Sequence, residues 1–284
     1  MKFPIAAFLF VLIIGLIQFN CERATEDSQK NAGSEKTASV VSSKRIPIRL
    51  GETAIYVDIF EKRSSSRVYF NMHDDENTAV EAAKSVVKKF GGKLIELQSK
   101  GERLITFSLN SQKYVFDPNR IFTEIGIDST LARHSKLSKE AHTEIARFVS
   151  NLFQILFANE LQCMVTVHNN GENGYSIKSY QAGGVYERDA EKTFANPERD
   201  PDDFFFVTKK SFFEYFKNQG QNVVLQNNDQ VTDDGSLSVY CGERNIPYIN
   251  VETQHGHLQR QIAMLEKVHE LLNIAAKKQE YCSN

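Results

Sequence analysis

The chain has 284 residues, of which 41% are hydrophobic and 25% are charged, and its formal net charge is −2. This composition is typical of a globular protein with a full-sized core. With this net charge the chain has no global basic field to hold a phosphate backbone, so no nucleic acid is expected among the partners. No internal repeat or long linker follows residue 44, which favours one folded domain over residues 44–284.

The N-terminus differs from the rest of the chain. Lys2 precedes the apolar run "FPIAAFLFVLIIGLIQF", which ends before Asn20 and Cys21 and is typical of an export signal over residues 1–21. The run is also just long enough for a retained membrane anchor. With Cys21 after it, the stretch resembles a bacterial lipoprotein signal, in which the cysteine is lipidated. We therefore expect an exported protein, in the periplasm or on the cell surface, anchored to a membrane through lipidated Cys21.

The next segment, residues 22–43, is polar and rich in Ser and Glu. Too few apolar groups are present to offset the entropy of ordering it, so we expect a disordered tether or an ordinary frayed terminus. Beyond Cys21, the remaining cysteines are Cys163, Cys241 and Cys282, an odd and widely spaced set that does not indicate a disulfide scaffold. Cys163 lies in the apolar run "LQCMVTV" and is expected to be buried and unreactive.

From residue 54 onward, apolar runs of strand length alternate with helical patterns. The strand-like runs are "AIYVDIF", "RVYFNM", "KLIEL", "RLITFSL", "KYVF", "QCMVTV", "NVVLQ" and "IPYINV". The helical patterns are "NTAVEAAKSVVKKF", "SKEAHTEIARFVSNLFQILFANE", "TKKSFFEYFKNQ" and "HLQRQIAMLEKVHELLNIAAKK". The pattern predicts an α/β three-layer sandwich, with a central sheet covered by helices on both faces. Because only "NSQ" separates "RLITFSL" from "KYVF", we expect these two strands to form a hairpin. The sheet is therefore expected to be mixed.

Polar side chains follow three of the predicted strands. His73 and Glu76 come after "RVYFNM", His168 ends "QCMVTVH", and Glu252 ends "IPYINVE". In open α/β sheets, ligands bind beyond the carboxyl ends of the strands, so we expect these groups to converge there. Two imidazoles and a carboxylate form a hydrolytic zinc set with a fourth position open for water. His73, Glu76 and His168 are the predicted ligands of one zinc ion, and Glu252 is the predicted proton acceptor.

A further strand end carries a group suited to binding a substrate. In "YVFDPNRIF", Asn119 and Arg120 follow the strand, and a guanidinium beside an amide can hold a carboxylate through two hydrogen bonds. Less specific alternatives exist for the other groups. His73 and Glu76 are also compatible with a solvated helix start, and His168 with an ordinary hydrogen-bonded histidine. His255 and His257 fit the start of the C-terminal helix better than a second metal site.

The order of "HDDE", "DPNR", "VHNN" and "NVE", over residues 67 to about 255, resembles the zinc carboxypeptidases of the carboxypeptidase A type and their succinylglutamate desuccinylase and aspartoacylase relatives. The resemblance implies zinc ligands at His73, Glu76 and His168, a carboxylate clamp at Asn119 and Arg120, and a general base at Glu252. Arg103, in "GERLITF", has a spacing like that of the family's arginine that polarises the scissile carbonyl. The family's tyrosine that closes over the substrate has two candidates, Tyr240 and Tyr248.

These observations lead to a functional hypothesis. We expect a zinc hydrolase that cleaves an amide bond next to a free carboxylate, most simply a carboxypeptidase acting on peptides or cell-wall stem peptides outside the cytoplasm. Deacylation of an N-acyl amino acid is the alternative within the same superfamily. A non-catalytic surface lipoprotein that keeps the fold is the alternative from another class.

Overall fold

The computed structural model describes residues 40–158, 163–171 and 174–278, all of which belong to one compact unit, Ser39–Asn284. The predicted export signal, Cys21 and the tether up to residue 39 lie outside the described residues. None of the helices in the described ranges is long and apolar enough to cross a membrane. The first strand begins at Val41, so the last three residues of the segment predicted as a tether belong to the sheet instead.

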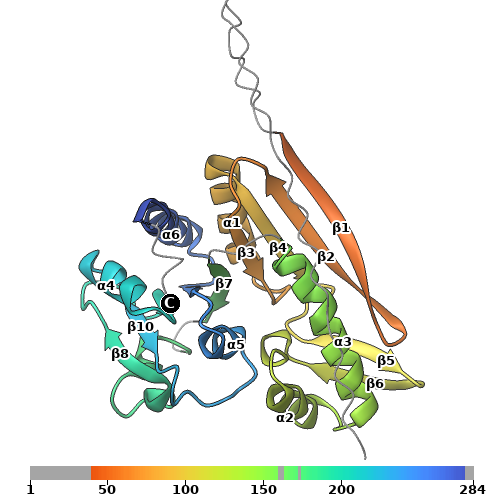
Figure 1. Cartoon of the computed structure of the whole chain (residues 1–284). Helices are drawn as coiled ribbons and strands as arrows, with labels where there is room; N and C mark the ends of the chain where they lie inside the picture. Colours follow the sequence, from red (N-terminus) through yellow and green to blue (C-terminus); the bar gives the residue numbers. More distant parts are fainter. Residues whose placement is uncertain (1–39, 159–162, 172–173, 279–284) are drawn as a thin grey trace, which may run out of the picture. The chain divides into compact units, whose positions relative to one another are not determined.

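The described residues form a nine-stranded mixed sheet and a separate two-stranded hairpin, shown in Figure 1. The strands of the large sheet are β1 (Val41–Leu50), β2 (Thr53–Lys62), β3 (Val68–Asn71), β4 (Gly92–Gln98), β7 (Met164–Asn170), β8 (Ala190–Phe194), β9 (Phe204–Val207), β10 (Val223–Gln226) and β11 (Tyr248–Gln254). Their spatial order is β1-β2-β4-β3-β7-β11-β9-β10-β8. The central strands β4, β3, β7 and β11 are parallel to one another. The antiparallel pairs include β1–β2, β2–β4, β11–β9 and β10–β8. The predicted mixed sheet is confirmed.

The predicted hairpin forms, but it does not belong to this sheet. β5 (Ile105–Leu109) and β6 (Gln112–Phe116) pair only with each other, through a turn in which Asn110 and Ser111 have φ values of 51° and 62°. The sheet is mixed for another reason, because β2, β9 and β10 run antiparallel to the central strands. The edge strand β1, which the sequence pattern did not predict, is mostly exposed along its first half. It gives a weak hydrophobic signal for that reason.

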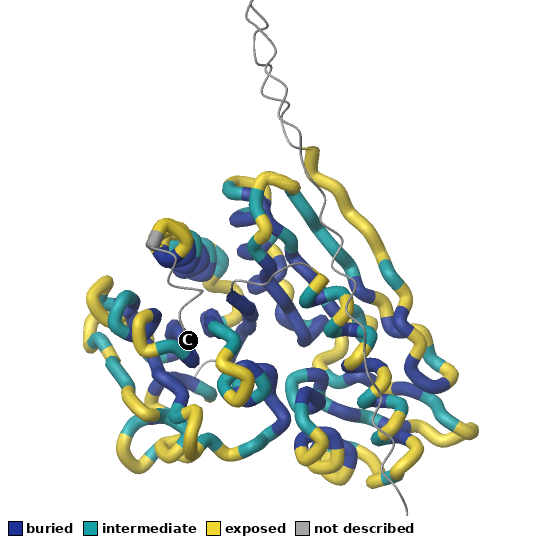
Figure 2. The backbone as a smooth tube through the Cα atoms, viewed as in Figure 1, coloured by how far each residue is buried: buried dark blue, intermediate teal, exposed yellow. Residues whose placement is uncertain are grey.

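Helices cover both faces of the sheet, as predicted. They are α1 (Asn77–Phe90), α2 (Glu124–His134), α3 (Lys139–Leu156), α4 (Lys210–Asn218), α5 (Leu237–Glu243) and α6 (Leu258–Lys278). The short 3₁₀ helices are η1 (Pro118–Arg120), η2 (Ile177–Tyr180) and η3 (Glu187–Asp189). One apolar core joins α1, α4 and α6 to the sheet, and a second core joins α2, α3, α5 and the hairpin to its other face. The two cores make three layers, and Figure 2 shows the buried strands between them.

The alternation of side chains along β7 and β11 determines which face carries the polar groups. Val167 and Val251 belong to the core under α1 and α6. Successive side chains on a strand point to opposite faces, so His168 and Glu252 face the α5 side. The two strands are parallel, and His168 is the register partner of Glu252. Two of the predicted site residues are thus direct neighbours across the sheet.

Candidate metal centre and active site

The three side chains predicted as metal ligands lie together at one edge of the sheet. His73 and Glu76 occupy the turn between β3 and α1, and His168 lies on β7. All three are buried, with 1%, 3% and 3% of their surface exposed. One ligand atom from each lies within 4.8 Å of the others, which is compatible with a bound metal ion.

The local sequence explains why these groups meet. β3 and β7 are parallel neighbours, so their carboxyl ends lie at the same edge of the sheet. After β3, the Glu76 N–H donates to the carbonyl oxygen of His73 at 3.1 Å, which closes a tight turn. Glu76 then stands at the N-cap of α1. The turn therefore directs both side chains toward the end of β7.

The carboxylate of Glu76 lies between the two imidazoles. His73 Nδ1 is 2.9 Å from Oε1 of Glu76, and His168 Nδ1 is 2.9 Å from Oε2. Burial alone disfavours the charged forms, but the attraction between Glu76 and the histidines outweighs it. The pKa of Glu76 falls well below its ordinary value, and the pKa of His73 rises to about 9. The site thus holds a buried anion that requires a cationic partner, such as the protonated ring of His73 or a metal ion.

The ring contacts of the histidines are suited to metal binding. Nε2 of His73 is 2.9 Å from Oδ1 of Asp117. A carboxylate at the outer nitrogen of a ligating histidine fixes the ring and leaves the other nitrogen free to bind the ion. Nε2 of His168 is buried without a hydrogen-bond partner among the described residues. Two imidazoles and one carboxylate leave a fourth position for water in a tetrahedral site, so the residues present fit a hydrolytic metal centre.

Asp117 is a site residue whose role was not predicted. Its carboxylate accepts hydrogen bonds from His73 and from the N–H of Asn119, the latter at 2.8 Å. Its own backbone N–H donates to Thr130 Oγ1 at 2.8 Å. Burial would raise the pKa of its carboxyl, but His73 and Arg120 hold that pKa well below its ordinary value. The only sequence signal was its position directly before "PNR". Its contact with His73, 44 residues away, exists only in the folded chain.

Glu252 lines the same cavity as the three predicted ligands. Only 5% of its surface is exposed, and its Oε1 accepts a hydrogen bond of 3.0 Å from Nδ2 of Asn250. Burial raises the pKa of Glu252, and the nearby charge of Glu76 adds to this effect, while His168 opposes it. A carboxylate with a raised pKa is a stronger proton acceptor than one in water, which is what a general base requires.

Arg103 also lies at the metal centre, in a half-exposed position. Its NH1 donates to Oε1 of Glu76 at 2.8 Å, and 49% of its side chain is exposed. Arg103 lines the same cavity as the predicted metal ligands. In this structure it neutralises part of the charge of Glu76.

Asn119 and Arg120 lie beside the cavity on η1, across from α5. Oδ1 of Asn119 accepts from the N–H of Leu237 at 3.4 Å, and NH2 of Arg120 is 3.5 Å from the carboxylate of Asp234. The negative charge of Asp234 raises the pKa of Arg120 against the effect of burial. Both predicted clamp residues line the cavity with the metal ligands. Asp234 is an acidic neighbour that was not predicted.

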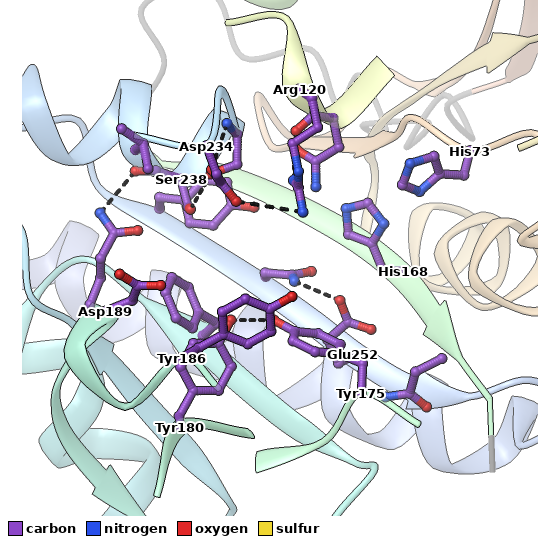
Figure 3. A pocket seen from close by; sticks show the side chains of 18 of the residues that line it. His73, Arg120, His168, Tyr175, Tyr180, Tyr186, Asp189, Asp234, Ser238 and Glu252 are labelled. Atoms are coloured by element: carbon purple, nitrogen blue, oxygen red, sulfur yellow. Dashed lines mark hydrogen bonds and ion pairs between the residues drawn. The ribbon is translucent and has the colours of Figure 1, made fainter. Parts of the chain in front are cut away.

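The cavity has a volume of about 390 Å³ and reaches well beyond the predicted residues. Figure 3 shows His73 and His168 at one end, Asp189 at the other, and Tyr175, Tyr180 and Tyr186 along one side. The three tyrosine rings contact one another with centroid distances of 5.6 to 6.1 Å. These tyrosines were not singled out in the sequence; Tyr175 in "NNGENGYS" and Tyr186 in "GGVYERD" lie in stretches that indicate only turns.

The structure also shows where the other residues named in the sequence analysis lie. Tyr248 is buried, lines the cavity, and bonds through its hydroxyl to Thr166 at 2.7 Å. Tyr240 packs against Phe153, with ring centroids 4.7 Å apart, and is not a lining residue. His255 and His257 are exposed in the turn before α6, outside the cavity lining. Cys163 is buried and unpaired, as expected, and Cys282 lies outside the described residues.

No protein-family model matches this sequence, and a search of curated proteins gave no match. Solved structures do match. One is a variant of the cell shape determinant protein Csd4 from Helicobacter pylori, with 12% identity and a TM-score of 0.42 over 72% of this chain and 49% of that one. The chain thus spans about half the length of that protein.

A second match is the murein-tripeptide amidase MpaA from Escherichia coli O157, with 11% identity and a TM-score of 0.42 over 85% of this chain and 96% of that one. A third is thrombin activatable fibrinolysis inhibitor, with 11% identity and a TM-score of 0.49 over 86% and 74%. These three solved structures are proteins of the zinc carboxypeptidase fold.

Proposed function

We propose that this protein is a zinc-dependent hydrolase that cleaves an amide bond next to a free carboxylate, and that its substrates are peptides, including cell-wall stem peptides. The observation that carries the proposal is the meeting of three groups in one cavity. These are the buried His73, Glu76 and His168 set, the buried carboxylate of Glu252, and the guanidinium of Arg120.

Each group has a defined part in this chemistry. A zinc ion held by the three ligands would polarise the scissile carbonyl and lower the pKa of water to about 7. Glu252 would accept a proton from the attacking water and pass it to the leaving nitrogen. Arg120 and Asn119 would hold the substrate's terminal carboxylate, and Arg103 would stabilise the negative charge that develops on the carbonyl oxygen.

The location of the protein belongs to the same proposal. An export signal with a lipidated Cys21 would place the domain in the periplasm or on the cell surface, attached to a membrane. Peptides and cell-wall fragments are the amides that such an enzyme would meet. Cleavage of N-acyl amino acids needs the same residues, and only a panel of substrates separates the two activities.

Replacement of Glu252 by Gln tests the catalytic role. Gln keeps the size of the side chain and an oxygen for Asn250, but it cannot accept a proton. The purified variant should bind one zinc ion per chain, measured by elemental analysis, while kcat falls by about 100- to 10,000-fold. Release of amino acids from peptide and N-acyl substrates gives the rate. Glu243→Gln is the matched control, because Glu243 is exposed on α5 and outside the cavity.

The outcomes separate the functional classes. Full activity of Glu252→Gln would remove Glu252 from the mechanism. Zinc binding without turnover of either substrate class by the unaltered protein would favour a ligand-binding lipoprotein on the same fold. Hydrolysis of N-acyl amino acids alone would identify a deacylase.

A further inference from the structure

The turn that carries Arg103 is anchored by a carboxylate from the metal-ligand segment. Asp74 lies in the His73–Glu76 turn, and 9% of its surface is exposed. Its Oδ2 accepts hydrogen bonds from the backbone N–H of Ser99 at 2.6 Å and from that of Gly101 at 2.7 Å. Hydrogen bonds to an ionised acceptor are shorter and stronger than those between neutral groups. One buried oxygen thus joins the segment between β3 and α1 to the segment between β4 and β5.

The register of the sheet explains why these two segments meet. β3 and β4 are parallel neighbours, and Asn71 at the end of β3 pairs with Glu96 on β4. Asp74 and Ser99 are the third residues after these two partners. The carboxyl ends of parallel strands lie at the same edge of a sheet, so both residues emerge there together.

The turn between β4 and β5 depends on support from outside. Lys100 and Gly101 have φ values of 63° and 77°. The N–H of Glu102 donates to the carbonyl oxygen of Ser99 at 3.3 Å, which closes the turn. A lysine adopts a left-handed conformation only at an energetic cost. The hairpin that follows pairs with no described strand of the large sheet. The contact with Asp74 therefore stabilises a turn that its own sequence disfavours.

Arg103 follows this turn and reaches the metal centre from it. Its guanidinium donates to Oε1 of Glu76 at 2.8 Å, although 49% of the side chain is exposed. Holding a long, half-exposed side chain in one orientation costs conformational entropy, so the backbone that carries it must be fixed. Asp74 and Glu76 belong to the same short segment. That segment therefore binds both the guanidinium and the turn from which the arginine extends.

We propose that Asp74 is a positioning residue, which holds the Ser99–Gly101 turn so that the guanidinium of Arg103 stays beside the metal ligands. In the proposed hydrolysis, Arg103 stabilises the charge that develops on the carbonyl oxygen, and such a donor must be in place before the reaction. Asp74 is not a lining residue of the cavity, so it acts through the turn. This inference rests on the proposed function, since it concerns the arginine assigned there.

A kinetic test separates the hydrogen bonds of Asp74 from its charge. In the zinc-loaded full chain, Asp74→Ala removes the acceptor, and kcat should fall by about 10- to 100-fold while KM and zinc content change little. Asp74→Asn keeps an oxygen for the two N–H groups and should restore most of the rate. Asp58→Ala is the matched control, because Asp58 pairs with Arg45 and lies outside the cavity lining. An equal loss of rate in Asp74→Asn and Asp74→Ala would contradict the positioning role.

A double-mutant cycle tests whether Asp74 acts through Arg103. Arg103→Ala should lower kcat by about 100- to 1,000-fold, as the loss of an oxyanion donor does. Asp74→Ala should cost nothing further in that background. If the two losses multiply, or if Asp74→Ala alone releases zinc, Asp74 acts on another part of the site and the proposal is wrong.

A measurement without turnover separates this proposal from the proposed function. In the zinc-loaded protein, NMR should show slow hydrogen exchange at the amides of Ser99 and Gly101 and an ordered side-chain Nε–H of Arg103. Asp74→Ala should speed the exchange and lower the Arg103 order parameter, whereas Asp58→Ala should change neither. This result supports the positioning role even if no amide is cleaved, in which case only the proposed hydrolysis fails.

The unaltered protein supplies a test that needs no variant. Fast exchange at both the Ser99 and the Gly101 amide would overturn the positioning role, whatever the activity. Circular dichroism checks that each variant is folded.

Discussion

Glu76 is the side chain around which the candidate metal centre is organised. Its two oxygens contact His73, His168 and Arg103, each at 2.8 to 2.9 Å. Isolated burial of a carboxylate is unfavourable, so a network of this kind persists only if its charges are matched. Without a metal ion, the protonated ring of His73 and the guanidinium of Arg103 supply positive charge.

A prediction at the residue scale concerns the carboxylate behind His73. In Asp117→Asn, the amide oxygen can still accept from Asn119, but the negative charge that holds the His73 ring is lost. We expect zinc affinity to fall by about 10- to 100-fold, measured by competition with a chelator. Asp128→Asn is the control, because Asp128 contacts the surface histidine His142 at 2.6 Å away from any metal ligand. Unchanged affinity in Asp117→Asn would show that the contact does not support the metal.

A second prediction at this scale is the pH dependence of the rate. Burial raises the pKa of Glu252 above the ordinary value of 4.5, and only the deprotonated form accepts a proton. As the pH falls through the raised pKa, the base becomes protonated and kcat/KM declines, so the acidic limb should lie above pH 4.5. The measurement is a pH–rate profile with zinc content determined at each pH. Loss of zinc in parallel with the rate would assign the limb to the ligands instead.

At the scale of elements, two glycines hold the carboxylate clamp in place. The backbones of Gly126 on α2 and Gly235 before α5 pack directly against each other. A Cβ on either residue would come within 2.8 Å of the carbonyl oxygen of Arg120. Gly235 also has a φ of 79°, which favours glycine. A 2.9 Å hydrogen bond from the Phe122 N–H to the Gly235 carbonyl joins the same segments. This close approach places Arg120 beside Asp234.

Gly126→Ala should therefore affect catalysis without touching the metal. The added methyl group separates η1 from the loop before α5 and displaces Arg120. Because small misplacements of a positioning group cost about 10- to 100-fold in rate, we expect kcat/KM to fall by that factor while zinc affinity stays unchanged. Ser129→Ala, at an exposed position on the same helix, is the control. An unchanged kcat/KM for the glycine variant would show that Arg120 tolerates the shift.

At the scale of the whole molecule, metal binding and stability are linked. The folded pKa of His73 is about 9, above the ordinary 6.5, so its charged contacts stabilise the metal-free fold fully below pH 6.5. This contribution is lost as the pH rises through 9. A bound metal ion replaces the proton, and at 100 times its dissociation constant it adds about 2.7 kcal/mol of stability.

The resulting prediction is a difference between two melting curves. From pH 6.5 to 9, the melting temperature of the metal-free protein should fall, whereas that of the zinc-loaded protein should change less. His73→Gln should remove both the pH dependence and the stabilisation by zinc. A metal-free protein whose melting temperature is constant over this range would contradict the raised pKa of His73.

The sequence predicted most of the central architecture because buried strands and amphipathic helices carry strong periodic signals. It did not predict β1, β8, β9, α2 or α5. β1 and β8 are edge strands with exposed residues, and β9 is four residues long in a Phe-rich stretch. Short or half-exposed elements are specified by their neighbours rather than by their own pattern.

The site residues also divide into those that the sequence predicted and those that only the folded structure reveals. His73, Glu76, His168 and Glu252 stood out because each is polar and directly follows an apolar strand. Asp74 was not assigned a role, although it lies in the same "HDDE" stretch, because an acidic residue before a helix is equally typical of a solvated turn. Only its burial and its two backbone partners reveal an anchor for the turn before Arg103.

The sequence by itself determined the layered α/β class and the residues able to perform the chemistry, because hydrophobic periodicity and strand-end polar groups are local properties of the chain. Tertiary structure alone decided that Asp117 supports His73, that two glycines bring Arg120 to Asp234, and that Asp74 anchors the turn before Arg103. These relations join residues tens of positions apart, and burial and distance between such residues exist only after the chain has folded.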